Sequence, residues 1–287
     1  MSGTGAIDVA WIRQQFPALS DVRLLGQGGQ KLVFSGTHSV YGETVLKLIS
    51  PRQDAEVTVR EILAVTRVGS PRVPQILEHG KLATPIGGYV WLIERRIGGH
   101  TVRDMLRLGP LIPRRVLRLG LHVLEALVAA ERVNIVHRDV KPDNIICDPA
   151  GDYWLIDFGI ARHLDLQSLT ATAAPFGKVT WGYSPPEQCR NMKPDIDSRA
   201  DLFALGVTLF ECATGSNPFR TGAADLLEVL RRVETMPLPR LALGLRAAGS
   251  FADLVLTLTQ KRRDHRPGSA AEALEWLTEI HNAELQE

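Results

Sequence analysis

The polar run HRDVKPDN occupies residues 137–144 and is flanked by apolar residues on both sides. It holds two carboxylates, an amide and three basic groups within eight residues. Thirteen residues beyond Asn144 comes a second polar motif, DFG at 157–159, directly after the apolar segment YWLI at 153–156. Short apolar segments of this kind are typical of strands. Two such strands carry both motifs to one edge, so the pattern predicts a site rather than an ordinary surface loop.

These residue types suit metal-assisted phosphoryl transfer. Asp157 and Asn144 offer the hard oxygen ligands that Mg²⁺ prefers. Asp139 can accept the proton of an attacking hydroxyl. A lone His-Arg-Asp is a weak signal, but the two motifs at this spacing are specific.

Length and composition fit one catalytic unit with two lobes. The chain has 287 residues, of which 45% are apolar and 23% charged, which is ordinary for a globular protein. The net charge of +1 gives no long-range field, so we expect neither a nucleic-acid partner nor a membrane surface. Three cysteines without C-x-x-C spacing predict no disulfide framework and favour a reducing, cytoplasmic setting. No signal peptide and no membrane span are expected.

The first third of the chain reads as one short helix and several strands. Apolar spacing predicts a helix over Ile7–Gln15 that ends before Pro17. A strand at 21–25, a glycine turn at 26–30 and a second strand at 31–36 follow. The next strand, 44–49, holds a single charge, Lys47, which is either an edge residue in water or a buried cation with a function.

Taken together, the motifs resemble those of the eukaryotic-like Ser/Thr protein kinases, and the bacterial members in particular. The resemblance also covers TWGYSPPE at 180–187, where Pro185 replaces the alanine of the family pattern. It implies an α+β, bilobal protein-kinase fold with a small β-rich N-lobe carrying one main helix and a larger, mostly helical C-lobe. Residues 1–20 would form an N-terminal extension and 21–287 the kinase domain. Within that domain we expect the N-lobe at about 21–94, the hinge at about 94–99 and the C-lobe at about 100–287.

The glycine turn is similar to the family's phosphate-binding loop. By this resemblance the turn residues cradle the ATP phosphates through backbone N–H groups, and Val33 covers the adenine. The turn residues concerned are Gly26, Gln27, Gly28 and Gly29. Lys31 stands where the family has a third glycine, a departure from the pattern.

The resemblance makes Lys47 the lysine that grips the α- and β-phosphates, paired with an acid of the next helix, residues 54–68. Glu61 is the predicted partner, and Glu56 is the alternative. A strand at 89–93 is then followed by the hinge, where Ile93 is the gatekeeper. The backbone of Glu94 and Arg96 is expected to bond the adenine edge.

The implied roles of the 137–144 loop follow. Asp139 deprotonates the acceptor hydroxyl, Lys141 neutralises the γ-phosphate, and Asn144 with Asp157 holds Mg²⁺, for which Mn²⁺ is an alternative. Lys141 together with Thr180 favours Ser/Thr hydroxyls of protein substrates over tyrosine. A pseudokinase that binds ATP without transfer is the alternative, and an aminoglycoside-type small-molecule kinase ranks lower.

Two further pairings are implied in the C-lobe. Glu187 is expected to bind Arg266, and Asp201 is expected to accept hydrogen bonds from the backbone of the His-Arg-Asp loop, with a helix cap as its plainer alternative.

Residues 160–183 are rich in Ser, Thr and Ala and read as a flexible activation segment. Autophosphorylation is predicted at Thr170 or Thr172, with Arg138 pairing with the phosphate. The alternative is that both threonines are ordinary loop residues.

Overall fold

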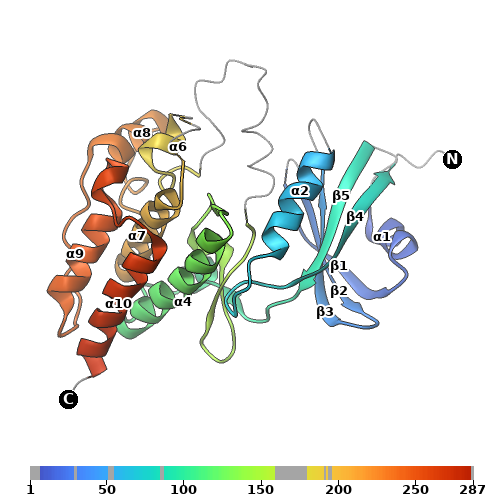
Figure 1. Ribbon diagram of the computed structural model, residues 1–287, viewed down its shortest axis with the longest axis horizontal. Helices are drawn as coiled ribbons and strands as arrows, with labels where there is room; N and C mark the ends of the chain where they lie inside the picture. The colour runs from blue at the N-terminus through green and yellow to red at the C-terminus, as the bar shows by residue number, and fades with distance from the viewer. Residues whose placement is uncertain are drawn as a thin grey trace. The chain divides into compact units, whose positions relative to one another are not determined.

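The computed structural model describes residues 7–28, 31–50, 55–84, 87–158, 180–190, 192 and 196–285, without the side chains of Ala55, Val57 and Glu61. The chain divides into two compact units, whose elements are labelled in Figure 1. The first unit holds the described residues of 7–67 and 74–97. The second holds those of 68–73, 98–158 and 180–285. No helix in these ranges is both long enough and apolar enough to cross a membrane.

The first unit is built on a five-stranded antiparallel sheet in the order β1-β2-β3-β5-β4. Its strands are β1 (Leu19–Gln27), β2 (Lys31–His38), β3 (Gly42–Ile49), β4 (Ile76–Thr84) and β5 (Gly87–Arg95). Two helices accompany the sheet, α1 (Val9–Gln15) and α2 (Ala55–Thr66). The N-terminus of α1 is capped by Asp8, whose Oδ1 accepts from the Trp11 N–H at 2.8 Å.

Successive side chains of a strand point to opposite faces of the sheet, and here both faces carry apolar residues. On one face Phe34 and Leu46 pack with Ile12 of α1. On the other, Leu92 packs with Ile62 of α2. Lys47 pairs directly with Leu92 in the ladder between β3 and β5, so the lysine lies on the face that α2 covers.

The second unit is mostly helical (Figure 1). Its α-helices are α3 (Val102–Leu106), α4 (Pro113–Arg132), α6 (Pro186–Cys189), α7 (Arg199–Thr214), α8 (Leu226–Thr235), α9 (Ala248–Leu258) and α10 (Ala270–Leu285). Short 3₁₀ turns are η1 (Pro142–Asn144) and η3 (Arg263–His265). Helix α7 is buried on nearly all sides because its residues are almost all apolar, and α4, α9 and α10 pack around it.

A small sheet in the second unit carries the predicted polar motifs. It has the order β6-β7-β8, with β6 (His100–Thr101), β7 (Ile145–Cys147) and β8 (Tyr153–Leu155). Strands β7 and β8 are antiparallel, and Ile145 pairs with Leu155. Asn144 directly precedes β7 and Asp157 follows β8, so the prediction that two short strands bring both motifs to one edge is confirmed.

The predicted α+β class, with a β-rich unit and a helical unit, is confirmed. Strand β4 is an addition, because no strand was predicted over Ile76–Thr84. Its residues are mostly half-buried on both faces, so the segment lacks the alternation that marks a strand in sequence.

Candidate active site

Asp201, near the start of α7, binds the backbone of the 137–144 loop. Its Oδ2 accepts from the His137 N–H at 2.6 Å and its Oδ1 from the Arg138 N–H at 2.7 Å, as predicted. Burial raises the pKa of Asp201 to about 7, against the opposing effect of these two hydrogen bonds. A buried carboxylate thus fixes the backbone immediately before Asp139.

His137 joins this loop to the segment after β8. The side chain is fully buried, its Nε2 lies 3.0 Å from the Ile156 oxygen, and its Nδ1 accepts from the Asp139 N–H at 3.2 Å. Because Nδ1 accepts, Nε2 carries the proton and donates. The ring also packs on Phe158, with centroids 4.6 Å apart. One imidazole therefore sets the relative position of the two motifs.

Asp139 receives three side-chain donors. Its Oδ1 accepts from the Thr180 hydroxyl at 2.5 Å. Its Oδ2 accepts from Lys141 Nζ and from Asn144 Nδ2, each at 2.9 Å. The structure thus brings together Asp139, Lys141 and Asn144, three residues predicted for the site, with Thr180 beside the carboxylate.

Asn144 and Asp157 have side-chain oxygens of the kind that bind a magnesium ion. Asn144 uses its amide nitrogen on the Asp139 carbonyl and carboxylate, which leaves Oδ1 as the atom for a cation. Its own carbonyl accepts from the Ile156 N–H at 2.9 Å, so the residue before Asp157 is adjacent. Within the described ranges no cluster of three or more His, Cys, Asp or Glu could hold a metal. Two oxygen ligands completed by phosphates and water suit Mg²⁺.

Backbone strain also marks this region. Arg138 and Asp157 adopt φ of 65° and 62°, in the left-handed region that non-glycine residues rarely occupy. Such residues persist where the surrounding contacts impose them, and they are concentrated at functional sites. Asp201 holds the backbone of Arg138, as described above.

Lys47, in the first unit, is buried and forms an ion pair with Glu94. Both side chains lie on the face of the sheet that α2 covers, because Val45 pairs with Glu94 and Lys47 with Leu92. Of the two possibilities that the sequence left for Lys47, the structure shows the buried cation. Glu94 was predicted to act through its backbone, and its side chain has a role that the sequence did not reveal.

The two candidate acids of α2 differ. Glu61 lies in the helix, but its side chain is outside the described residues. Glu56 forms an ion pair with Lys81, and its side chain is 61% exposed. Glu56, the alternative partner for Lys47, is therefore bound to Lys81 at the surface.

The glycine turn joins β1 and β2. Gly26 pairs with Val33, and the Gly28 N–H donates to the Lys31 carbonyl at 2.8 Å. A Cβ added to Gly26 would meet no described atom within 4 Å, and one added to Gly28 only the Lys31 oxygen at 3.9 Å. Packing against the described atoms does not demand glycine at these two positions. Gln27 ends β1 and is exposed, and Gly29 lies outside the described residues.

Backbone groups of the predicted hinge are already engaged, and the Arg95 N–H donates to the Gln75 carbonyl at 2.9 Å. The Arg96 N–H donates to the Glu43 carbonyl at 3.1 Å, and its guanidinium pairs with the Glu43 carboxylate. An adenine contact through this N–H would have to replace the bond to Glu43.

Arg266 and Glu187 form the predicted bidentate pair. Nη1 lies 2.6 Å from Oε1 and Nη2 3.0 Å from Oε2. The Arg266 side chain has no exposed surface, and it also donates to the backbone oxygens of Arg199, Gln260 and Lys261. This pair ties the segment after Thr180 to the region around η3.

We expect Glu187→Gln to lower the free energy of unfolding by about 3 kcal/mol, because it leaves the buried Arg266 charge without its counterion. Urea denaturation measures the loss. Glu234→Gln is the matched control, since its partner Arg190 is 56% exposed and such pairs contribute at most about 1 kcal/mol. Equal losses in the two variants would contradict the assignment.

Lys261 is a second cation near Arg266, half-buried as a residue but with a buried Nζ. Its Nζ has no hydrogen-bond partner among the described residues and lies over the Phe219 ring, 4.3 Å from the centroid. Burial and the repulsion of Arg266 lower the pKa of Lys261 to about 8 from 10.5. The ring faces of Phe219 and Phe203 partly compensate the charge.

The stability of the chain should therefore rise between pH 8 and about 10.5 through Lys261. In this window the unfolded chain binds the proton that the folded chain has released, so unfolding free energy increases with pH. Lys261→Met removes the effect. Urea unfolding at pH 8 and pH 10 compares wild type with variant, and parallel changes in both would show that Lys261 does not titrate there.

A polar network beside the loop was not predicted. Arg103 of α3 donates to Glu211 at 2.7 Å and to the Tyr183 hydroxyl at 2.6 Å, and its Nε lies 3.3 Å from Asp143. Tyr183 also donates to Glu211. Burial and the neighbouring Glu211 raise the pKa of the Tyr183 hydroxyl. The only sequence signal was Glu211, one of two acids in the mostly apolar helix α7.

A loop that presents a carboxylate beside a lysine and an asparagine, close to an Asp-Phe motif, has the residue types of the kinase class of phosphotransferases. The protein kinase domain family matches residues 19–277 of the chain. The chain therefore belongs to the protein kinase family, as the sequence motifs predicted.

Similar curated proteins are bacterial serine/threonine-protein kinases. PknB of Mycobacterium tuberculosis is 33% identical over 234 residues, which are 79% of this chain and 36% of PknB. PknD of the same species is 33% identical over 238 residues, 80% of this chain and 35% of PknD. PknH of Mycobacterium bovis is 33% identical over 224 residues, 76% and 36% of the two chains. The match thus spans about a third of each of these relatives.

Proposed function

We propose that the chain is a serine/threonine protein kinase that transfers the γ-phosphoryl group of ATP to hydroxyls of protein substrates. One contact carries the proposal: the Thr180 hydroxyl donates to the Asp139 carboxylate at 2.5 Å. A threonine hydroxyl thus reaches the oxygen that would accept the proton of a substrate Ser or Thr. The names of the relatives PknB, PknD and PknH agree with this activity.

In this proposal Asp139 orients the acceptor hydroxyl and takes its proton. Lys141, 2.9 Å from the same carboxylate, places a positive charge where the phosphoryl group would arrive. Lys47 would grip the α- and β-phosphates of ATP, with Glu61 as its partner in α2. Mg²⁺, or Mn²⁺ in its place, would be held by Asn144 and Asp157 and would neutralise the charge of the phosphates.

ATP recognition is proposed to use the remaining predicted residues. The backbone of Gly26, Gln27, Gly28 and Gly29 would bind the phosphates, and Val33 would cover the adenine. The backbone of Glu94 and Arg96 would bond the adenine edge, with the Arg96 N–H exchanging its present partner, the Glu43 carbonyl.

Incubation with radiolabelled ATP, Mg²⁺ and a generic basic protein tests the activity. We expect label on serine and threonine after acid hydrolysis, and none on tyrosine. ATP binding without any transfer, measured on the same preparation, would contradict the kinase activity and would identify a pseudokinase.

The activation segment extends the proposal. We propose autophosphorylation at Thr170 or Thr172, both outside the described residues. Arg138 would pair with the phosphate, and its backbone is already bonded to Asp201 and, through its carbonyl, to Gln188 at 3.1 Å. A charge bound there acts on the residue before Asp139. Peptide mapping after incubation with ATP that finds neither threonine modified would contradict this switch.

We also propose that the kinase acts in the cytoplasm. Cys147, Cys189 and Cys212 are free thiols, which fits a reducing compartment that supplies ATP.

A further inference from the structure

Arg103 of α3 binds three polar groups close to the proposed acceptor site. Its Nη1 donates to the Glu211 carboxylate at 2.7 Å, its Nη2 donates to the Tyr183 hydroxyl at 2.6 Å, and its Nε lies 3.3 Å from the Asp143 carboxylate. These partners come from α7, from the segment after Thr180 and from η1. One guanidinium therefore connects α3 with three other segments of the second unit.

Two of these partners adjoin the residues that would handle the acceptor hydroxyl. The Tyr183 N–H donates to the Thr180 carbonyl at 3.0 Å, so both residues belong to one turn, and the Thr180 hydroxyl reaches Asp139. Asp143 follows Asp139 by four residues in the same loop. A substrate that brings its hydroxyl to Asp139 therefore passes neighbouring side chains close to Arg103 and Asp143.

The charges around Arg103 are those of a cation site that is already filled. The Glu211 side chain is 6% exposed and that of Arg103 25%, whereas the Asp143 side chain is 48% exposed. Two carboxylates on one surface would attract a basic side chain of a substrate, since a guanidinium binds carboxylates through short charge-assisted hydrogen bonds. Here the chain itself supplies that guanidinium, so a second cation would meet a like charge and gain little.

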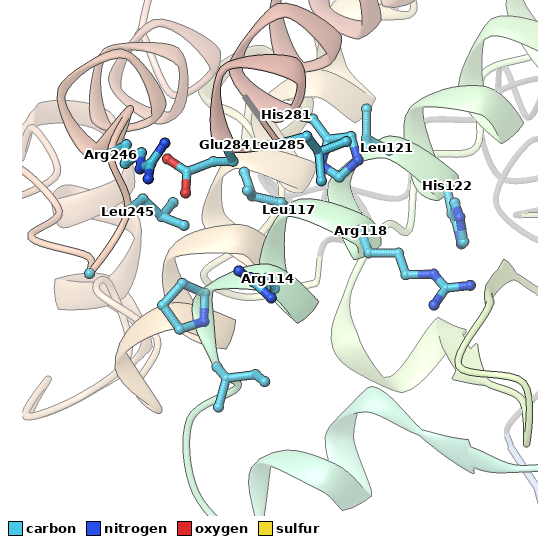
Figure 2. Close-up of a pocket in the computed structure, with 13 residues that line it drawn as sticks. Arg114, Leu117, Arg118, Leu121, His122, Leu245, Arg246, His281, Glu284 and Leu285 are labelled. Atoms are coloured by element: carbon cyan, nitrogen blue, oxygen red, sulfur yellow. The ribbon is translucent and has the colours of Figure 1, made fainter. Parts of the chain in front are cut away.

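Other arginines of the second unit are held differently. Arg107 follows Arg103 by one turn, pairs with Asp104 and is 73% exposed. Arg118 lines a surface hollow beside α4 and α10, extends toward the side where His122 lies (Figure 2), and is 48% exposed. Enclosure by two carboxylates and a hydroxyl distinguishes Arg103 from both.

We propose that Arg103 is a specificity-determining residue: it occupies the place of a substrate cation, and so removes any preference of the enzyme for a basic residue beside the acceptor. This role rests on the proposed kinase activity. Removal of the Arg103 charge frees Glu211 and Asp143 for an arginine of the substrate. The variant then prefers, at one position near the acceptor, a side chain to which the wild type is indifferent.

Steady-state transfer to a series of peptides tests this role. The parent is a threonine peptide that the wild type phosphorylates, with arginine or citrulline at one of three positions on either side of the threonine. Citrulline is nearly as large as arginine but uncharged, so the ratio of the two kcat/KM values isolates the effect of charge. We expect ratios within about twofold for the wild type and about ten at one position for Arg103→Gln, since a hydrogen bond between charged groups contributes about that factor.

Two variants serve as controls. Arg107→Gln removes the same charge one turn further on, and Arg103→Lys keeps the charge, so both should keep the wild-type ratios. The gain of Arg103→Gln should disappear when Glu211→Gln is added, because one of the two carboxylates is then lost. Melting temperatures and transfer to the citrulline peptides show that the variants are folded.

Unchanged ratios in folded Arg103→Gln, or an equal gain in Arg107→Gln, would overturn this role while the kinase activity stands. If Arg103→Gln does not fold, the wild type decides. Ratios near one support the role, and an arginine preference that Asp143→Asn abolishes overturns it, because substrates would then reach the carboxylate with Arg103 in place. Absence of transfer to every peptide would overturn the kinase activity, and the role of Arg103 with it.

Discussion

Asp139→Asn is expected to reduce phosphoryl transfer to below about a hundredth of the wild-type rate. Asparagine keeps the size of the side chain and one oxygen, so Thr180 can still donate to it. The residue loses the carboxylate that accepts the proton of the acceptor hydroxyl. One acceptor oxygen becomes an NH2 donor, but Asp201 still holds the backbone of this loop, so the thermal melt should stay close to that of wild type.

Asp143→Asn is the matched control for this variant. It makes the same change four residues later in the same loop, where the side chain is 48% exposed and its partner Arg103 lies 3.3 Å away. We expect this control to retain at least about a tenth of the activity, since exposed ion pairs contribute little. Initial rates at saturating ATP compare the two. Similar rates in both variants would remove Asp139 from the catalytic role.

The sequence was sufficient to predict a functional residue where a charged side chain stands in an otherwise apolar segment. Asp201 is a charge in an apolar helix, and the structure shows it buried beneath the 137–144 loop. The apolar segments around the two polar motifs predicted β7 and β8, because short apolar runs flanked by polar residues leave few other arrangements. Lys47 was found in the same way, as one charge in an apolar strand.

Sequence was insufficient where a contact depends on the pairing of distant segments. Glu94 precedes two arginines and reads as the start of a polar linker, but the register of β3 against β5 turns its side chain toward Lys47. The contact between Arg103 and Glu211 joins residues 108 positions apart, and neither has a local signal for the other. Side-chain partners of this kind follow from tertiary packing, which periodicity does not encode.

The ion pair with Glu94 changes what is expected of Lys47. Removal of the lysine leaves a buried carboxylate without this counterion, because Glu94 is only 8% exposed. The Lys47→Met variant should therefore lose about 3 kcal/mol of stability in the first unit. If Lys47 binds the ATP phosphates as proposed, its rate of phosphoryl transfer should also fall by more than about a hundredfold.

A double-mutant cycle separates these two effects. In Lys47→Met with Glu94→Gln the buried carboxylate charge is gone, so urea unfolding should show most of the stability restored, while transfer stays abolished. Glu94→Gln alone keeps the Lys47 charge and should stay within several-fold of the wild-type rate. Recovery of activity in the double variant would show that Lys47 only stabilises the sheet, and that the phosphates are bound by other groups.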